Sequence, residues 1–306
     1  MYRNLLATLS ASMSRSHASR ELKWMRESLC TEFNGTLTPE SVKTLEDMVS
    51  RRARGEPLQY ILGSQPFGPL DLIVRPPTLI PRPETEDWTI RLAGEISPTK
   101  ASPITMLDLC TGSGCIPLLL NYLWPSGSNH AICVDVSQDA LNLAHENAVR
   151  CGISVEFANE GSPTSTKSAS ILLLLDDVLR SNFPERLANL GEPSFDLITA
   201  NPPYIPLAEY VNLNSTVKMY EDHRALLGDP NHTCHGEGLS FYRAFATQVR
   251  RYDLLKDCGM IVLEVGENQS DEVQRLMLND AKMQRTAVWR DPWGKERVVV
   301  AWKSTG

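Results

Sequence analysis

Ile104-Thr-Met-Leu-Asp-Leu-Cys-Thr-Gly-Ser-Gly-Cys115 is the stretch of this chain that decides its fold. Its first half, Ile104 to Leu109, is a short apolar run typical of a buried strand. A helix is predicted after Cys115, because Pro117 stands in the first turn, where a missing backbone N–H does no harm. A strand, a Gly-x-Gly loop and a helix in this order allow a cofactor to approach the backbone closely.

A carboxylate follows these glycines at a distance that suits a ribose. Asp135 ends the next predicted strand, Ala131 to Asp135, about 20 residues after the loop, where a carboxylate can bind a ribose diol. The dinucleotide fingerprint G-x-G-x-x-G would need a third glycine, but the position three after Gly114 is Pro117. The spacing therefore favours S-adenosylmethionine over NAD or FAD.

A second motif, Asn201-Pro-Pro-Tyr204, follows a strand predicted from Phe195 to Ala200. It suits methyl transfer to a flat amide or amine nitrogen, which needs positioning more than it needs a strong base. The Asn201 side-chain oxygen can accept one N–H of that group, and the Pro202 carbonyl can accept the other. The prolines stiffen the loop by fixing φ, and Tyr204 can pack against the flat group. Alone the motif could be an ordinary turn, but with the glycine loop upstream it predicts a methyltransferase.

These motifs resemble those of the HemK/PrmC family of protein glutamine-N5 methyltransferases, which modify the Gly-Gly-Gln motif of peptide-chain release factors. The resemblance is dense from about Arg54 to Trp302. DNA adenine methyltransferases share Asn-Pro-Pro-Tyr, but they are not expected to carry Ile-Pro-Arg-Pro-Glu-Thr-Glu. The matching segments are Arg54-Gly-Glu-Pro-Leu-Gln-Tyr-Ile-Leu-Gly63, Leu79-Ile-Pro-Arg-Pro-Glu-Thr-Glu86, Leu107-Asp-Leu-Cys-Thr-Gly-Ser-Gly-Cys-Ile116, Val134-Asp-Val-Ser-Gln-Asp-Ala-Leu141, Asn201-Pro-Pro-Tyr-Ile205, Leu263-Glu-Val-Gly-Glu-Asn-Gln269 and Asp291-Pro-Trp-Gly-Lys-Glu-Arg297.

The resemblance implies an α/β fold of the class I S-adenosylmethionine-dependent methyltransferases. Such a fold has a doubly wound, mostly parallel seven-stranded sheet, here with an antiparallel final strand and a small N-terminal helical domain. The implied cofactor is S-adenosyl-L-methionine and the product S-adenosyl-L-homocysteine. The expected cofactor-binding residues are Asp108, Cys110, Thr111, Gly112, Ser113, Gly114, Asp135, Asp177, Val178 and Asn201. The expected catalytic residues are Asn201, Pro202 and Tyr204, and the expected substrate-binding residues are Asn201, Pro202, Pro203, Tyr204, Arg82 and Glu84.

Two segments depart from the family pattern. Between Phe157 and Phe195 the chain is longer than expected. The insertion covers residues 159–170, and its Ser/Thr-rich part, Ser162–Ser170, predicts a surface loop. The acid expected near the adenine is then Asp176 or Asp177, and the pattern Asp-Val-Leu favours Asp177, with Val178 beside the adenine. The second departure is Asp222, which stands where relatives usually have a proline after glutamate.

The chain divides into a helical domain over residues 21–63, a β-hairpin linker over 64–84 and a catalytic domain over 85–306. In the first domain, helices are expected over Glu21–Cys30 and over Pro39–Arg54, with Thr38 as the N-cap of the second. The linker is expected to pair Leu70–Val74 with Leu79–Ile80. The resemblance implies that the helical domain helps to grip the release factor.

Residues 1–20 contain three arginines and five serines but no acidic residue. This composition is typical of a mitochondrial transit peptide, with a disordered tail or the first helix of the domain as the alternatives. Mitochondrial relatives exist in the family, so a mitochondrial location is expected, with a cytoplasmic one as the alternative.

Composition bounds the remaining choices. The net charge of −7, without a block of Lys or Arg, is unusual for an enzyme that acts on nucleic acid. Seven scattered cysteines fit a reducing compartment, and Ile171–Leu175 is too short to span a membrane. His232-Thr-Cys-His235 lacks a second pair of ligands and predicts a loop, so no metal is expected. We expect a monomer that binds a release factor and neither nucleic acid nor membrane.

Two other functional classes remain open from the residues alone. One is an N6-adenine nucleic-acid methyltransferase or a ribosomal-protein glutamine methyltransferase. The other is a non-catalytic binding subunit that keeps the cofactor fold, and the intact Asn201–Tyr204 motif argues against it. Glu264 is interpreted as a satisfied carboxylate at a strand end, without a catalytic role.

Overall fold

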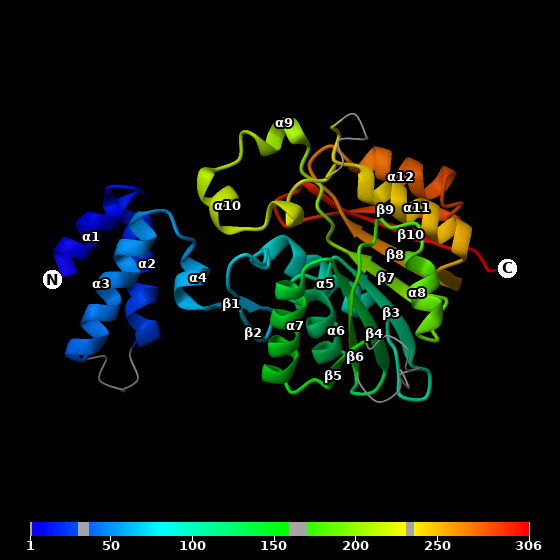
Figure 1. Ribbon diagram of the computed structural model, residues 1–306, viewed down its shortest axis with the longest axis horizontal. Coiled ribbons are helices and arrows are strands. Elements are labelled where there is room, and N and C mark those ends of the chain that lie inside the picture. The colour runs from blue at the N-terminus through cyan, green and yellow to red at the C-terminus, as the bar shows by residue number, and fades with distance from the viewer. Residues whose placement is uncertain (1, 30–36, 159–169, 231–235, 306) are drawn as a thin grey trace.

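The computed structural model describes residues 2–29, 37–158, 170–230 and 236–305. A small group of helices at the N-terminal end stands beside a larger α/β domain (Figure 1). The small group contains α1 (Tyr2–Ser10), α2 (Arg15–Leu29), α3 (Pro39–Ala53) and α4 (Leu58–Leu62). The predicted start of α3 is confirmed, because the Thr38 hydroxyl accepts a hydrogen bond from the Ser41 N–H at 3.1 Å.

The helical domain begins earlier than the sequence predicted. Leu5, Leu9 and Ala18 are buried in one apolar cluster with residues of α2, α3 and α4. Burial of these side chains stabilises residues 2–20 as helices, so the border at residue 21 and the disordered tail are corrected for this stretch. A transit function of the same residues stays a prediction.

A two-stranded hairpin links the helical domain to the rest of the chain, but its pairing differs from the prediction. β1 (Ser64–Phe67) pairs antiparallel with β2 (Leu70–Ile73), and Leu79–Ile80 is not a strand. The ladder ends at Ile73 because its partner strand begins at Ser64, directly after Gly63, which closes α4 in a left-handed conformation. The predicted second strand is therefore wrong, although the hairpin itself is present.

The larger domain is built on one sheet, in which the described residues form eight strands in the order β5-β6-β4-β3-β7-β8-β10-β9. The strands are β3 (Ile104–Leu109), β4 (Asn129–Asp135), β5 (Val155–Phe157), β6 (Ile171–Leu175), β7 (Phe195–Ala200), β8 (Leu255–Glu264), β9 (Arg285–Arg290) and β10 (Glu296–Trp302). Neighbouring strands from β5 to β8 pair parallel, whereas β10 runs antiparallel to β8 and β9.

The topology confirms a doubly wound, mostly parallel sheet with an antiparallel final strand, and it adds one strand to the seven predicted. The added strand is β5, a three-residue edge strand with partly exposed side chains, which leaves little pattern in the sequence. In the segment expected to be inserted, residues 159–169 lie outside the described residues, as do His232, Cys234 and His235.

Helices cover both faces of this sheet because each strand alternates its apolar side chains between two clusters. Leu107 and Leu109 pack with α8 (Phe183–Asn189), α11 (Ser240–Tyr252) and α12 (Ser270–Asn279) on one face. Met106 packs with α5 (Pro83–Glu95), α6 (Cys115–Leu123) and α7 (Gln138–Arg150) on the other. The two sets of helices flank the sheet in Figure 1. None of the described helices is both long and apolar enough to cross a membrane.

One buried amide ties the linker hairpin to the catalytic domain. Asn147, on α7, accepts a hydrogen bond from the Ile73 N–H at 2.7 Å. Its Nδ2 donates to the Ile73 carbonyl and to the Ser113 carbonyl, both at 3.1 Å. The side chain is completely buried, so nothing but these partners satisfies it. Asn147 therefore joins the hairpin to the loop that follows β3.

We expect Asn147→Ala to lower the free energy of unfolding by about 2–3 kcal/mol, because buried backbone groups of Ile73 and Ser113 lose their partner. Chemical denaturation of the purified protein measures this change. The matched control is Asn142→Ala on the exposed side of the same helix, which should change stability by less than about 0.5 kcal/mol. If both variants lowered the free energy of unfolding equally, the hydrogen bonds of Asn147 would not be the cause of the loss.

Candidate active site

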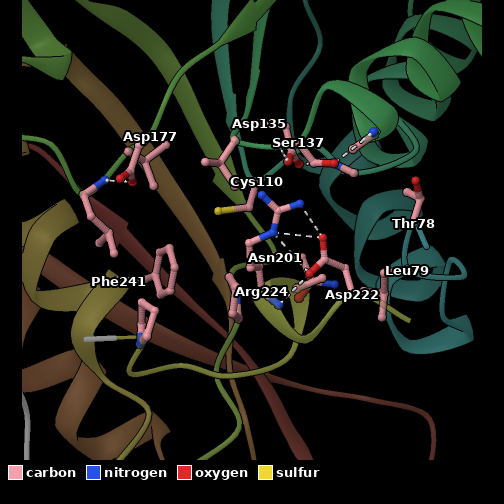
Figure 2. Close-up of a pocket in the computed structure, with 18 of the residues that line it drawn as sticks. Thr78, Leu79, Cys110, Asp135, Ser137, Asp177, Asn201, Asp222, Arg224 and Phe241 are labelled. Carbon is pink, nitrogen blue, oxygen red and sulfur yellow. Dashed lines mark hydrogen bonds and ion pairs between the residues drawn. The ribbon is translucent and has the colours of Figure 1, made fainter. Parts of the chain in front are cut away.

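A cavity of about 210 Å³ lies at the carboxyl ends of β3, β4, β6 and β7. This edge is where open α/β sheets bind ligands, because the loops after parallel strands meet there. Figure 2 shows Cys110, Asp135, Asp177 and Asn201 around the cavity, each from the end of a different strand. Phe241 from α11 adds an apolar wall. Four loops distant in sequence therefore contribute to one site.

The loop after β3 is shaped by residues in the left-handed region of backbone space. Gly112 has φ 56° and Gly114 has φ 78°, which glycine adopts without strain. A Cβ added at Gly112 would meet nothing within 4 Å, so the backbone there is open to a ligand. A Cβ at Gly114 would stand 3.2 Å from the Ala144 Cβ, so this glycine lets α6 and α7 approach. The two glycines thus serve different purposes.

Cys110 adopts φ 59° although it is not a glycine, and its side chain lines the cavity. A side chain held in this region at a functional site is strained, and the surrounding packing must stabilise it. Burial raises the pKa of the Cys110 thiol well above its ordinary value, which keeps the group neutral. Thr111, Ser113 and Gly114 complete the loop and are not among the residues that line the cavity.

Asp135 holds the glycine loop and faces the cavity at the same time. Its Oδ2 accepts a hydrogen bond from the Gly112 N–H at 2.8 Å, and its Oδ1 accepts one from the Ser137 N–H at 2.9 Å. Burial raises the pKa of Asp135, while the two N–H donors and the nearby Arg224 act in the opposite direction. Each carboxylate oxygen keeps capacity for a further donor, which suits the two hydroxyls of a ribose.

Asp108 lies beneath the same loop, fully buried at the end of β3. Its Oδ1 accepts a hydrogen bond from the Thr199 hydroxyl at 2.6 Å, but its Oδ2 and the Thr111 hydroxyl have no hydrogen-bond partner among the described residues. Burial raises the pKa of Asp108 to about 7. Unsatisfied buried polar atoms are rare, and here they lie beside a loop that is open to a ligand. This arrangement fits the amino-acid end of a cationic cofactor.

Both candidate acids for the adenine line the cavity, but their carboxylates differ in what they bind. The Asp176 side chain is buried, its Oδ2 lies 3.2 Å from Arg186, and its Oδ1 accepts from the Asp177 N–H. Asp177 is half-buried and accepts one hydrogen bond, from the Leu179 N–H at 2.9 Å. Within the described ranges, its other carboxylate oxygen has no partner and can accept from an amine. Val178 also lines the cavity, which supports the predicted alignment.

The Asn201-Pro-Pro-Tyr204 motif begins directly after β7 and contributes Asn201 and Pro203 to the cavity wall. Asn201 Nδ2 donates a hydrogen bond to the Thr85 hydroxyl at 3.1 Å. Pro202 and Tyr204 are not among the lining residues. The Tyr204 hydroxyl lies 3.4 Å from Glu264, so this ring has a partner within the protein.

Glu264 is linked to Asn201 through the Thr85 hydroxyl, a connection that the sequence did not indicate. It is almost completely buried at the end of β8, where its Oε2 accepts from the Thr85 hydroxyl at 2.6 Å and from Trp88 Nε1 at 2.8 Å. Burial raises the pKa of Glu264 above its ordinary value, against the donors that favour the charged form. Its membership of the segment Leu263–Gln269 was the only signal that could have drawn attention to it.

The predicted substrate residues Arg82 and Glu84 are not among those that line the cavity. Arg82 Nη2 binds both carboxylate oxygens of Glu221, at 2.6 and 2.7 Å, and Glu221 is buried. The pair therefore fastens the start of α5 to the segment that follows α10 (Ser215–Tyr220). A role of Arg82 and Glu84 toward a substrate stays a prediction.

Asp222 gives the departure from the family pattern a structural meaning. Its backbone N–H donates to the Pro77 carbonyl at 2.8 Å, a bond that a proline could not make. Its carboxylate caps the following short helix by accepting from the Arg224 N–H, and it also binds the Arg224 guanidinium. The pair lines the cavity, opposite Asp135 (Figure 2).

Comparisons with known proteins agree with this geometry. A family model described as the PrmC N-terminal domain matches residues 14–63. A release factor glutamine methyltransferase of Geobacter sulfurreducens is 34% identical over an alignment of 293 residues, which covers 92% of this chain and 89% of that protein. The chain belongs to the release factor glutamine methyltransferase family. This membership confirms the resemblance predicted from the motifs, and it agrees with the class I methyltransferase fold of the larger domain.

Other members of the family are similar over the same length. The release factor glutamine methyltransferase of Thermodesulfovibrio yellowstonii is 32% identical, with 92% of this chain and 89% of that protein covered. A solved structure described as a release-factor-specific protein-(glutamine-N5) methyltransferase, from Alicyclobacillus acidocaldarius, is 24% identical with a TM-score of 0.40. That likeness covers 74% of this chain and 94% of the other. The family assignment rests on the sequence relatives.

We expect Asn201→Ala to lower the methyl-transfer rate by about 10² or more, because the substrate amide loses the group that positions it. Affinity for S-adenosylmethionine should change by no more than a few-fold, since the glycine loop and Asp135 stay intact. Initial rates and titration calorimetry measure the two quantities. Near-normal turnover in this variant would remove Asn201 from its assigned role.

Asp135→Ala should act mainly on the cofactor. Loss of hydrogen bonds to a carboxylate costs about 1.5–3 kcal/mol, which is roughly a tenfold to hundredfold weaker affinity for S-adenosylmethionine. Asp139→Ala, in the first turn of α7, removes the same charge nearby and should change the affinity less than about twofold. Calorimetry compares the two variants, and equal effects would show that charge alone, not ribose contact, is responsible.

Proposed function

We propose that this protein transfers a methyl group from S-adenosylmethionine to the side-chain amide nitrogen of a glutamine. The target glutamine is that of the Gly-Gly-Gln motif in a peptide-chain release factor. The observation that carries the proposal is that Asn201 and Pro203 open into the same cavity as Gly112 and Asp135. The names of the relatives in this family support the choice of substrate.

The cavity residues fit the cofactor in a definite way. Gly112 leaves its backbone open, Asp135 accepts from the ribose hydroxyls, and Asp177 accepts from the adenine amine. When bound, S-adenosylmethionine supplies a methyl group on a positively charged sulfur. The walls of Val178 and Phe241 exclude water, and a desolvated site favours a reaction in which that charge disappears.

The acceptor side of the mechanism depends on positioning. The Asn201 Oδ1 atom and the Pro202 carbonyl each accept one N–H of the glutamine amide, which aims its nitrogen at the methyl carbon. The new N–C bond would form as the bond from the methyl carbon to the sulfonium sulfur breaks, with S-adenosylhomocysteine as the leaving group, and the extra amide proton would leave to solvent. This sequence needs neither a strong base nor a metal.

Compartment and assembly belong to the same proposal. We propose a monomeric enzyme in the mitochondrion, supported by the acid-free, arginine- and serine-containing residues 1–20, with the cytoplasm as the alternative. Imaging of the full chain with a C-terminal fluorescent tag decides between the two compartments. Sedimentation of the purified protein, alone and with release factor, measures its assembly state.

The substrate prediction separates a release factor from nucleic acid and from ribosomal protein. A folded release factor should accept methyl on the glutamine of its Gly-Gly-Gln loop, and a short peptide should be a much poorer substrate. A flexible peptide must be ordered on binding, and a small site has little contact energy to offset that cost. Mass spectrometry of the release factor after incubation with cofactor locates the methyl group.

Two controls accompany this experiment. Replacing the target glutamine of the release factor by glutamate removes the nucleophilic NH2 and should abolish transfer. Adenine-containing oligonucleotides should be inert, because the chain carries a net charge of −7 without a block of basic residues. Methylation of adenine or of a ribosomal protein, with no modification of any release factor, would overturn the proposed function.

A further inference from the structure

A chain of hydrogen bonds links the acceptor amide of the active site to a buried carboxylate. Asn201 Nδ2 lies 3.1 Å from the Thr85 hydroxyl, and that hydroxyl lies 2.6 Å from Glu264 Oε2. Trp88 Nε1 binds the same carboxylate oxygen at 2.8 Å. Thr85, Trp88 and Glu264 are each at most 2% exposed, so water does not compete for these bonds. None of the three lines the cavity.

With Glu264 ionised, the donors and acceptors in this chain can be ordered in one way. The indole N–H of Trp88 can only donate, so Glu264 Oε2 acts as an acceptor. The Thr85 hydroxyl has a single proton, and its short contact to Oε2 uses that proton. The hydroxyl can then only accept on its other side, where Asn201 lies. An amide offers a donor at its NH2 group and an acceptor at its oxygen, so its NH2 group must face Thr85.

We propose that Thr85 and Glu264 are positioning residues that hold the Asn201 amide with its oxygen toward the methyl-acceptor site. The proposal rests on the proposed function, because it concerns the same transfer. A flipped Asn201 would present NH2 to the substrate NH2, and two donors cannot bind each other. The chain of hydrogen bonds therefore selects the one orientation of Asn201 that can receive a glutamine amide.

The fold places Asn201, Thr85, Trp88 and Glu264 together. Ala200 of β7 pairs with Leu263 of β8 in parallel register, so the next residues, Asn201 directly after β7 and Glu264 at the end of β8, lie side by side. Helix α5 brings Thr85 and Trp88 over them, three residues apart and therefore on the same side of the helix. The Thr89 hydroxyl donates to the Thr85 carbonyl at 2.7 Å within the same helix.

A purely structural role for these residues makes a different prediction. If Thr85 and Glu264 served only to satisfy buried polar atoms, their loss would reduce stability but leave the rate of the folded enzyme unchanged. The experiment therefore compares variants at equal concentrations of folded, cofactor-binding protein. It separates the maximal rate kcat from the affinity for S-adenosylmethionine.

Thr85→Val keeps the shape of the side chain but removes its hydroxyl. It should lower kcat on the release factor by roughly tenfold to hundredfold, because misplaced contact groups carry costs of this size. The affinity for S-adenosylmethionine should stay within about twofold, since Thr85 does not line the cavity. Thr85→Ser restores the hydroxyl and should recover most of the lost rate. Unchanged kcat in Thr85→Val overturns the proposal.

Thr89→Val is the matched control. Thr89 is as buried as Thr85 and lies one turn further along α5, but its hydroxyl binds only a backbone carbonyl. Thr89→Val should therefore lower kcat by less than about threefold. A loss equal to that of Thr85→Val would mean that any polar deletion in α5 damages the enzyme, and the proposal would fall.

Glu264 is tested by two substitutions. Gln can place its oxygen at the position of Oε2 and accept from Thr85 and Trp88, whereas Leu cannot accept. Glu264→Gln should therefore retain at least about ten times the kcat of Glu264→Leu. Equal rates for the two variants contradict the acceptor role. Cofactor affinity again reports whether each variant is folded.

One readout keeps this proposal apart from the proposed function. The side-chain NH2 resonances of Asn201, assigned by NMR in the wild-type protein, should shift in Thr85→Val and not in Thr89→Val. This outcome does not depend on the identity of the substrate. A wild-type enzyme that never methylates a release factor would end the proposed function, whereas unshifted Asn201 resonances in Thr85→Val would end the positioning role.

Discussion

The parallel register of three neighbouring strands is the constraint on which the site depends. Leu109 of β3 pairs with Val134 of β4 on one side and with Ala200 of β7 on the other. The glycine loop, Asp135 and Asn201 therefore leave the sheet at nearly the same level. A cofactor site and a methyl-acceptor site can then adjoin without long loops reaching toward each other. The hydrogen bonds of the sheet therefore set the relative positions of the cofactor site and the methyl-acceptor site, and methyl transfer to an amide depends mainly on those positions.

The loop after β7 is also held in place by Gln269 and Gly238, which lie far from it in the sequence. Gln269 Nε2 donates to the Tyr204 carbonyl and to the Glu237 carbonyl, both at 2.9 Å. The Gly238 backbone lies so close to this loop that an added Cβ would stand 2.2 Å from the Tyr204 carbonyl oxygen. Two prolines, an amide clamp and a close backbone approach thus restrict the same few residues. Such restraint keeps the acceptor groups in place before any substrate binds.

Local patterns predicted those features that are encoded locally. The glycine spacing, Asp135 and Asn201 each stand at a strand end, and the structure brings them to one cavity. Contacts between distant segments leave no such pattern: Glu264 meets Thr85 across 179 residues, and although each lies in a segment that matches the family, nothing in either segment indicates that the two side chains bind each other. The hairpin pairing failed for another reason, because alternation indicates strands but does not choose their partners. For residues 1–20 the sequence left a transit peptide, a disordered tail and a first helix as alternatives, because the burial of Leu5 and Leu9 against distant helices leaves no distinctive composition.

Asn147 couples the local motions of two segments, the linker hairpin and the glycine loop. Its amide holds the end of the linker hairpin and the glycine loop together, through Ile73 and Ser113. Neither segment can open without breaking bonds that belong to the other, so the two form one local unit of unfolding. Order gained at the glycine loop when a ligand binds is then shared with β2, whose partner strand β1 follows the N-terminal helices directly. The enzyme thereby couples the rigidity of its cofactor site to that of the arm leading to its helical domain.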